Sequence, residues 1–141
     1  METGNRRVSL IVQAAWLQKL FPSSMMQRER EYGLLWVGEL QPTFLSRVYT
    51  IRLYYHHLDG LKVSVVMPDR LSMAEGKSKL PHVYSTVKQE LCLFFPDGSE
   101  WNPSMLFTRT VIPWASEWLM YYELWLGDGQ WRGGGTKHLF E

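Results

Sequence analysis

Cysteine is nearly absent from this sequence, which has 141 residues and one thiol, Cys92. A single thiol excludes an internal disulfide and any metal site built from several thiolates, so we expect it to be reduced. No apolar run approaches the roughly 18 residues of a membrane span. Gln13, Gln18 and Lys19 interrupt the apolar stretch that a cleavable signal would need. The sequence therefore predicts a cytoplasmic protein that has no membrane partner.

A large net charge of either sign is also lacking. Fifteen Lys and Arg residues against 14 Asp and Glu residues give a formal net charge of +1, and the two signs are interspersed. This pattern provides no electrostatic footprint for a nucleic-acid backbone, so nucleic acid is not an expected partner. The alternating RERE at residues 28–31 is interpreted as a solvated loop or helix end rather than as a binding patch.

The residues that are present indicate one α+β domain over residues 1–141, since 45% hydrophobic and 21% charged residues can supply a core. Apolar residues at helical spacing predict a helix over 8–21, which Pro22 should end. Branched and aromatic runs at 33–40, 47–56 and 61–67 predict an antiparallel β-meander with one buried side. The predicted buried positions are Tyr49, Ile51, Leu53 and Tyr55 in the second strand and Leu61, Val63, Val65 and Met67 in the third.

The end of the second hairpin carries two histidines, His56 and His57, before the Asp59-Gly60 turn signal. Both are possible metal ligands, but adjacent strand residues point to opposite faces and cannot easily converge on one ion. We therefore predict neither a metal nor a cofactor. Residues 68–80 turn polar and are interpreted as a surface loop, which either folds over the following segment or only connects to it.

The stretch from Pro81 to Pro103 contains the thiol. Cys92 lies in a short apolar run, LCLFF, that a Pro-Asp-Gly turn brings to an end, so it is expected at the edge of a short strand or loop. Asn102 followed by Pro103 predicts the start of a helix, because Asn caps free backbone donors and Pro suits the first helical position.

The segment after the thiol, residues 103–126, has a helical pattern that contains Pro113, which is expected to split it into two helices. Its aromatic residues recur every three or four positions and form a stripe. We expect this stripe to pack over the sheet, and a stacking or docking face is the alternative. Gly127-Asp128-Gly129 is expected to stop the helix. The stripe consists of Trp114, Trp118, Tyr121 or Tyr122, and Trp125.

The spacing around the thiol carries further information. His82 lies ten positions before Cys92, and Trp101-Asn102-Pro103 begins nine positions after it. This resembles the active-site segment of ubiquitin-conjugating (UBC) enzymes, where a His-Pro-Asn element precedes the catalytic cysteine and a Trp-Ser-Pro element follows it. The stretches LPHVYS, LCLFFP, EWNPSM, VIPWASEWLMYYELWL and WRGGG are more closely similar to the small ubiquitin-conjugating-like proteins of bacterial antiphage operons of the type II CBASS class.

The resemblance implies a UBC-like fold and an acyl (thioester) transferase. Cys92 would form a thioester with the C-terminal carboxyl of a partner, the cGAS-like nucleotidyltransferase of the operon, and so regulate second-messenger synthesis. Trp101, Asn102 and Pro103 would support the site, and a separate activating enzyme is a further possible partner. Ordinary UBC enzymes have Pro and Asn where this chain has Val83 and Tyr84, so Tyr84 would have to supply the hydrogen bond that their Asn makes to the oxyanion.

The residues themselves leave several alternatives open. Cys92 is either the nucleophile, as a thiolate, or a buried structural thiol. His82 is either a structural histidine that hydrogen-bonds the backbone around the site, which we prefer, or a general base. The whole chain is either a conjugating-type enzyme or a non-catalytic module that grips the partner's tail. A cysteine hydrolase is a third reading, which would require a base within hydrogen-bond reach of Cys92.

The tail also has two interpretations. WRGGG at residues 131–135 superficially resembles the diglycine ends of ubiquitin-like modifiers, but six residues follow Gly135, so without trimming there is no terminal glycine carboxylate to activate. Since glycine leaves the backbone unrestrained, we predict a flexible or tightly turning tail over residues 132–141.

Overall fold

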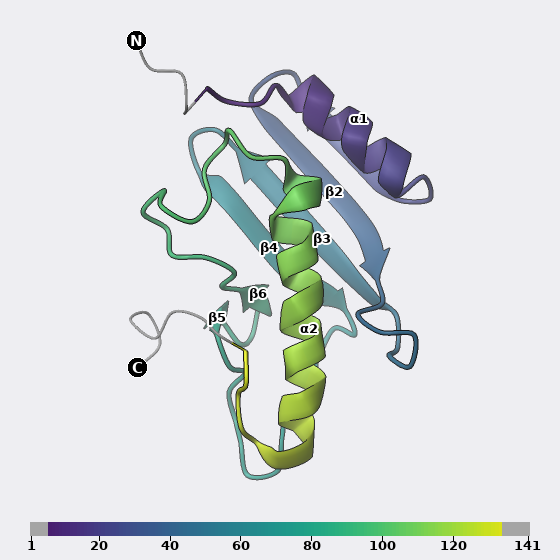
Figure 1. Ribbon diagram of the computed structural model, residues 1–141, viewed down its shortest axis with the longest axis vertical. Coiled ribbons are helices and arrows are strands. Elements are labelled where there is room, and N and C mark those ends of the chain that lie inside the picture. Colours follow the sequence, from purple (N-terminus) through teal and green to yellow (C-terminus); the bar gives the residue numbers. More distant parts are fainter. Residues whose placement is uncertain (1–5, 134–141) are drawn as a thin grey trace.

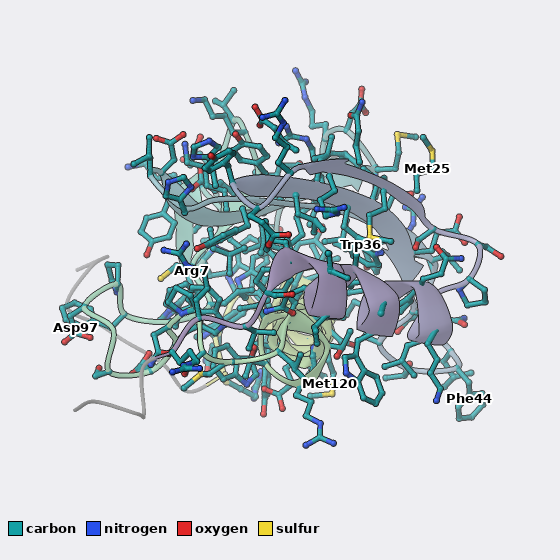
Figure 2. The ribbon with its side chains drawn as sticks, turned by 90° about the horizontal axis from the view of Figure 1, so that it is seen from above. Arg7, Met25, Trp36, Phe44, Asp97 and Met120 are labelled. Carbon is teal, nitrogen blue, oxygen red and sulfur yellow. The ribbon has the colours of Figure 1, made fainter. Side chains whose placement is uncertain are left out.

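The computed structural model describes residues 6–133 of the chain. They form an α+β structure, as predicted, around one six-stranded antiparallel sheet. Figure 1 shows the element order, and Figure 2 shows both α-helices on the same side of the sheet. The elements are α1 (Leu10–Leu20), β1 (Met25–Glu29), β2 (Gly33–Leu40), β3 (Tyr49–His56), β4 (Gly60–Met67), β5 (Val83–Ser85), β6 (Glu90–Leu91), the 3-10 turn η1 (Phe107–Arg109) and α2 (Val111–Asp128). The strand order in the sheet is β1-β2-β3-β4-β6-β5.

The first helix forms where the sequence predicts it, shorter by one or two residues at each end. The Ser9 side chain accepts a hydrogen bond from the Val12 amide at 3.3 Å and so caps the helix start. Buried Gln13 ties α1 to the segment before α2, because its side chain donates to the Met105 carbonyl and accepts from the Phe107 amide. None of the helices within residues 6–133 has the length and apolarity that a bilayer crossing needs.

The predicted β-meander is confirmed as β2, β3 and β4. All four predicted core residues of β3 are at most 3% exposed, because alternate side chains of a strand share one face. On β4, Val63 and Val65 are buried as predicted, whereas Leu61 is half-buried and Met67 is 56% exposed. Met67 lies on the solvent side because the pairing of β3 with β4 shifts register between Thr50 and Ile51. The prediction for Met67 is therefore wrong.

The interpretation of residues 28–31 as a loop or helix end is partly wrong. Arg28 and Glu29 are the last residues of β1, an edge strand that pairs with β2. Only Arg30 and Glu31 belong to the turn, where Arg30 has a φ of 52° and Arg28 forms an ion pair with Glu31 at 3.5 Å. The strand escapes a sequence pattern because nearly all of its side chains are exposed, so none of the alternation typical of a half-buried strand arises.

Two helix predictions in the C-terminal half are wrong. No helix begins at Asn102-Pro103, where the Asn102 side chain instead accepts hydrogen bonds from the amide and hydroxyl of Ser104 and closes a turn. Pro113 does not split a helix, because α2 begins at Val111 and Pro113 lies in its first turn. Amides in the first turn have no partner within the helix, so a proline there removes no hydrogen bond.

The aromatic stripe of α2 packs into the core, as expected. Trp118, Tyr122 and Trp125 are each at most 4% exposed, and they belong to the same buried cluster as the apolar face of the sheet. Trp114 and Tyr121 are half-buried at the margin of this cluster. The helix ends at Asp128, and Gly129 follows with a left-handed φ of 76°, as the Gly-Asp-Gly signal predicts.

Candidate functional site

Cys92 is the first residue after β6, and the sheet brings it next to His82. The Cys92 amide donates to the His82 carbonyl at 3.1 Å, and Val83 pairs with Leu91 between β5 and β6. His82 has a φ of 46°, which is uncommon for a residue with a side chain. The spacing of ten positions thus corresponds to a backbone contact. The thiol residue itself is only 6% exposed.

Tyr84 covers the thiol. It lies in a β-bulge, since the register between β5 and β6 shifts between Val83 and Ser85. Its hydroxyl is hydrogen-bonded to the Cys92 thiol and lies 3.5 Å from the Phe94 carbonyl oxygen. The Cys92 Sγ atom is also 3.5 Å from the Phe94 carbonyl oxygen. Hydroxyl, thiol and carbonyl therefore meet at one point, while the Tyr84 side chain stays 46% exposed.

The surroundings of the thiol keep it protonated at neutral pH. Burial raises the pKa of Cys92 above its ordinary value, since burial disfavours the charged thiolate. Hydrogen bonds from the Tyr84 hydroxyl and with the Phe94 backbone act in the opposite direction, and the carboxylate of Glu100 raises the pKa further. Burial and the bond to the thiol likewise raise the pKa of Tyr84, so its hydroxyl remains a proton donor.

His82 makes contacts near the thiol through both its backbone carbonyl and its imidazole ring. The carbonyl accepts the Cys92 amide and also the Trp118 indole Nε1–H at 3.1 Å, so α2 contacts the thiol segment through this residue. The imidazole stacks on the Trp131 indole, with ring centroids 5.3 Å apart and planes 22° apart. Through these contacts His82 connects the thiol segment to α2 and to Trp131. The role of His82 as a structural histidine stays a prediction.

Trp101, Asn102 and Pro103 anchor the chain after the thiol. The Trp101 ring is 6% exposed and lies against Phe94 and Phe107, with centroid distances of 5.5 and 6.0 Å. Asn102 closes the turn described above, and the Pro103 carbonyl accepts the Val8 amide at 2.8 Å. The three residues therefore hold the ends of the thiol loop through ring packing and hydrogen bonds.

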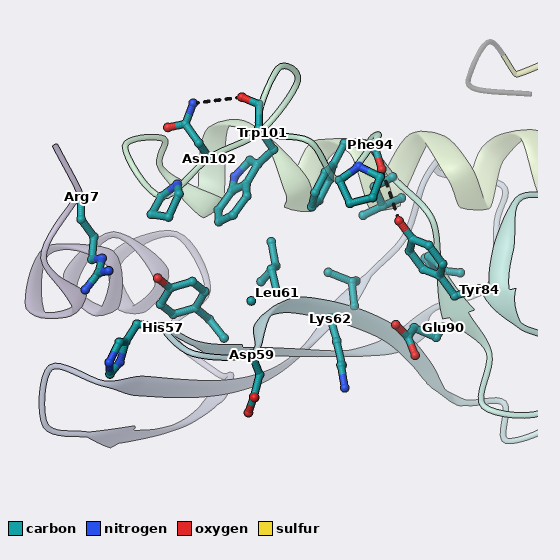
Figure 3. A pocket seen from close by; sticks show the side chains of 18 residues that line it. Arg7, His57, Asp59, Leu61, Lys62, Tyr84, Glu90, Phe94, Trp101 and Asn102 are labelled. Atoms are coloured by element: carbon teal, nitrogen blue, oxygen red, sulfur yellow. Dashed lines mark hydrogen bonds between the residues drawn. The ribbon is translucent and has the colours of Figure 1, made fainter. Parts of the chain in front are cut away.

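A cavity of about 480 Å³ lies between the β3–β4 hairpin and the chain around the thiol. Figure 3 shows Arg7 and His57 at one end and Tyr84 and Glu90 at the other, with the Trp101 ring between them. Apolar side chains form most of its lining, and Cys92 does not line it. The thiol therefore lies behind Tyr84 at the end of this cavity.

Gln89 fixes the turn between β5 and β6. It is 4% exposed with a φ of 52°, and its side chain accepts the Leu71 amide at 2.6 Å. The amide nitrogen of the side chain donates to the carbonyls of Val65 and Pro68 at 2.9 and 3.0 Å. The polar loop of residues 68–80 is thus held against β4 by Gln89, and three of its apolar residues enter the core. These are Leu71, Ala74 and Leu80.

The two histidines of the hairpin are close to each other. The His56 and His57 rings stack with centroids 5.1 Å apart, because β3 ends at His56 and the turn brings the next ring onto the same side. Our expectation that they point to opposite faces is wrong. Within residues 6–133 no group of three His, Cys, Asp or Glu side chains is arranged to hold a metal ion.

Sequence reasoning missed three contributors to the site. The Phe94 carbonyl contacts the thiol and is a backbone group, so no side-chain pattern could identify it. Gln89 and Trp131 are the other two. A lone Gln in a turn gives no signal, whereas a tryptophan in a glycine-rich tail does, because a large apolar ring there implies a buried contact. Of the tail predicted as flexible, Arg132 and Gly133 are described, and residues 134–141 lie outside the described residues.

Comparison with known proteins identifies the family to which the chain belongs. Residues 13–139 match the model of the family described as Type II CBASS E2 protein. Curated proteins show no match to the chain. The matched range covers most of the 141 residues and includes Cys92, His82 and Tyr84. The chain therefore belongs to the family of type II CBASS E2 proteins and has a role in CBASS defence alongside other components of such systems.

Proposed function

We propose that Cys92 forms a thioester with the C-terminal carboxyl of a cGAS-like nucleotidyltransferase, and that the protein holds or transfers this acyl group to regulate second-messenger synthesis. The observation that carries this proposal is the arrangement of Cys92 beside His82 and Tyr84, in a chain of the E2 family with no second thiol. We further propose that residues 1–141 form one UBC-like domain, located in the cytoplasm, that uses no cofactor.

The acyl group must arrive already activated, as a thioester on a separate activating enzyme. The Cys92 thiol first loses its proton to solvent. The resulting thiolate attacks the thioester carbonyl carbon, and the tetrahedral intermediate collapses with loss of the donor's thiolate, which takes up a proton from solvent. The Tyr84 hydroxyl then serves as the hydrogen-bond donor to the oxyanion, which is the task of a polar group held close to the reacting sulfur. Transfer follows when an amine attacks the new thioester, expels the Cys92 thiolate and releases a proton to solvent.

The burial of Cys92 means that the site has to open before it reacts. The Tyr84 hydroxyl and the Phe94 carbonyl both contact the sulfur, and an incoming carbonyl carbon needs that position. Tyr84 is 46% exposed, so its ring can shift enough to admit the carbonyl carbon without disturbing the core, while its hydroxyl stays within reach of the oxyanion. A bound partner thus both exposes the thiol and lowers its pKa by reducing its burial.

The test is the intact mass of the protein co-expressed with the nucleotidyltransferase and activating enzyme of its operon, compared with Cys92→Ala. We expect a covalent adduct that thiol or hydroxylamine cleaves and that Cys92→Ala abolishes. Tyr84→Phe should form less adduct, because it lacks the donor to the oxyanion. An adduct that persists in Cys92→Ala would refute thioester chemistry at this residue.

A non-catalytic binding module for the same partner is the second candidate. It is favoured by the burial of Cys92 and by the raised pKa, both typical of a structural thiol. On this alternative, a tight complex forms without any covalent adduct and is unchanged in Cys92→Ala. Gel filtration of the co-expressed pair, wild type beside Cys92→Ala, separates the two functions.

A further inference from the structure

The chain after α2 returns to the thiol segment. Gly129 reverses its direction with a φ of 76°, and its amide donates to the Trp125 carbonyl at 2.7 Å. In Figure 1 the yellow segment turns back from the end of α2 and runs toward β5. We call residues 129–133 the C-terminal strap.

An ion pair at its base holds the strap. The two terminal nitrogens of the Arg132 guanidinium, Nη1 and Nη2, donate to the Asp128 carboxylate at 3.0 and 2.5 Å. The carboxylate also accepts a hydrogen bond from the Gln130 amide at 3.0 Å. Hydrogen bonds from Arg132 lower the pKa of Asp128 to about 2. The pair is exposed, so it directs the turn and adds little stability.

Trp131 is the part of the strap that enters the structure. Its indole stacks on His82 and lies 5.8 and 5.9 Å from the rings of Trp118 and Tyr121. Gly133 fits the same contact closely, because a Cβ there would lie 2.9 Å from atoms of Trp131 and Tyr121. Among residues 6–133 the buried indole nitrogen of Trp131 has no hydrogen-bond partner, so the contacts described for this ring are packing contacts.

His82 connects this ring to the thiol. Its imidazole contacts Trp131, while its carbonyl accepts the Cys92 amide and the Trp118 Nε1–H. Its positive φ is a strained conformation for a residue with a Cβ, and such a conformation persists only when neighbouring groups hold it. Trp131 and Trp118 are those neighbours.

We propose that Trp131 is a positioning residue for Cys92 that acts through His82. The stacked indole holds His82 in its left-handed conformation, and the His82 carbonyl then fixes the Cys92 amide and with it the burial of the sulfur. The biological meaning of this control rests on the proposed function of Cys92, whereas the physical coupling does not.

The test measures alkylation of Cys92 by iodoacetamide, followed by intact mass, in wild type, Trp131→Ala and Trp131→Phe. Removal of the ring should accelerate alkylation by about fivefold, the factor expected when one intramolecular hydrogen bond is lost. The midpoint of the rate against pH should also fall, because reduced burial lowers the pKa of the thiol. Trp131→Phe keeps the stacking and should restore both values. Trp16→Ala, which truncates a half-buried tryptophan on α1, is the matched control and should change neither.

A double-mutant cycle separates this role from a general loss of stability. His82→Asn removes the imidazole but tolerates a positive φ. If Trp131 acts through His82, adding Trp131→Ala to His82→Asn should change alkylation no further. Fully additive effects, or an unchanged rate in Trp131→Ala below its melting temperature, would overturn the proposal.

The outcome is independent of the adduct experiment, because alkylation requires no partner. Coupling between Trp131 and Cys92 without any thioester would refute the proposed function and leave the positioning role intact. A thioester that forms while Trp131→Ala leaves alkylation unchanged would refute the positioning role alone.

Discussion

The β2–β4 meander and the thiol segment of β5 and β6 belong to one sheet but are built differently. Each meander strand has eight residues in antiparallel pairing that shifts register once, between Thr50 and Ile51, whereas β5 has three residues and β6 has two. Positive φ values at His82 and Gln89 and a bulge at Tyr84 interrupt the thiol segment. The long strands provide a stable surface, whereas the short, irregular segment places the Tyr84 hydroxyl and the Phe94 carbonyl beside the sulfur.

The two regions are also held by different forces. The meander is stabilised by apolar burial, with Trp36 and Leu53 both 0% exposed opposite each other. The thiol segment depends on individual polar contacts from Gln89 and Trp118. We therefore expect substitutions in the meander to change global stability and substitutions in the thiol segment to change local reactivity.

The largest effect should come from Trp36→Ala in the meander. This truncation removes a fully buried ring and its hydrogen bond to Ser24, and should lower the free energy of unfolding by about 3–5 kcal/mol. Urea unfolding measures it, with Trp16→Ala as the control for loss of an indole that is only half-buried. A loss below about 1 kcal/mol, within the range of surface substitutions, would contradict the view that the meander is the stable region.

Gln89→Ala should have the next largest effect. It leaves the Leu71 amide and the carbonyls of Val65 and Pro68 without their partners. We expect a total loss of about 1–3 kcal/mol, because water can enter the space of the lost side chain and solvate these groups in part. Gln89→Gly removes the same side chain but suits the φ of 52°, so the difference between the two variants reports the backbone strain alone. Equal unfolding free energies for wild type and both variants would show that Gln89 is dispensable.

The smallest effect, and the one confined to the thiol segment, is expected for Tyr84→Phe. The Tyr84 hydroxyl lowers the pKa of Cys92 against the larger effect of burial, so its removal should move the midpoint of Cys92 alkylation to higher pH. The sign is opposite to that expected for Trp131→Ala. Unfolding by urea at pH 7 should hardly change, and a midpoint that moves to lower pH would contradict the hydrogen bond.

The raised pKa of Cys92 also affects stability. A thiol whose pKa is raised by folding stabilises the protein below its ordinary pKa, and this contribution is lost as the pH rises toward the folded value. Comparison of Cys92→Ala with wild type across this range tests the sign: wild type should lose more stability than the variant.

Elements with a periodic pattern of apolar residues or a clear stop signal were predictable from the sequence. Alternation identified the buried face of β3, helical spacing identified α1, and the glycine after Asp128 identified the end of α2. The edge strand β1 was missed because its side chains are exposed on both faces. Asn102-Pro103 and Pro113 misled because a cap signal and a proline each fit two local structures, a turn or a helix start, and the choice depends on distant partners such as Val8 and Gln13.

Part of the candidate site was predictable from the sequence and part was not. The spacing of His82, Cys92 and Trp101 marked the segment, and the family match confirmed the resemblance that it carries. The contact of the sulfur with the Phe94 carbonyl had no sequence signature, because a backbone group made it. Trp131 indicated a buried ring, but its partner, His82, is set by the path of the chain after α2.

The sequence by itself determined the fold class, the meander, the presence of a single thiol and the family, because these depend on periodic patterns and on residue identity. Only the tertiary structure decided that Cys92 is buried beneath Tyr84, that its pKa is raised, and that the chain after α2 returns to His82. Burial and the pKa it produces depend on which groups surround an atom in space. Those groups come from β5, β6, α2 and the C-terminal strap, which are separate in the sequence and come together only in the folded protein.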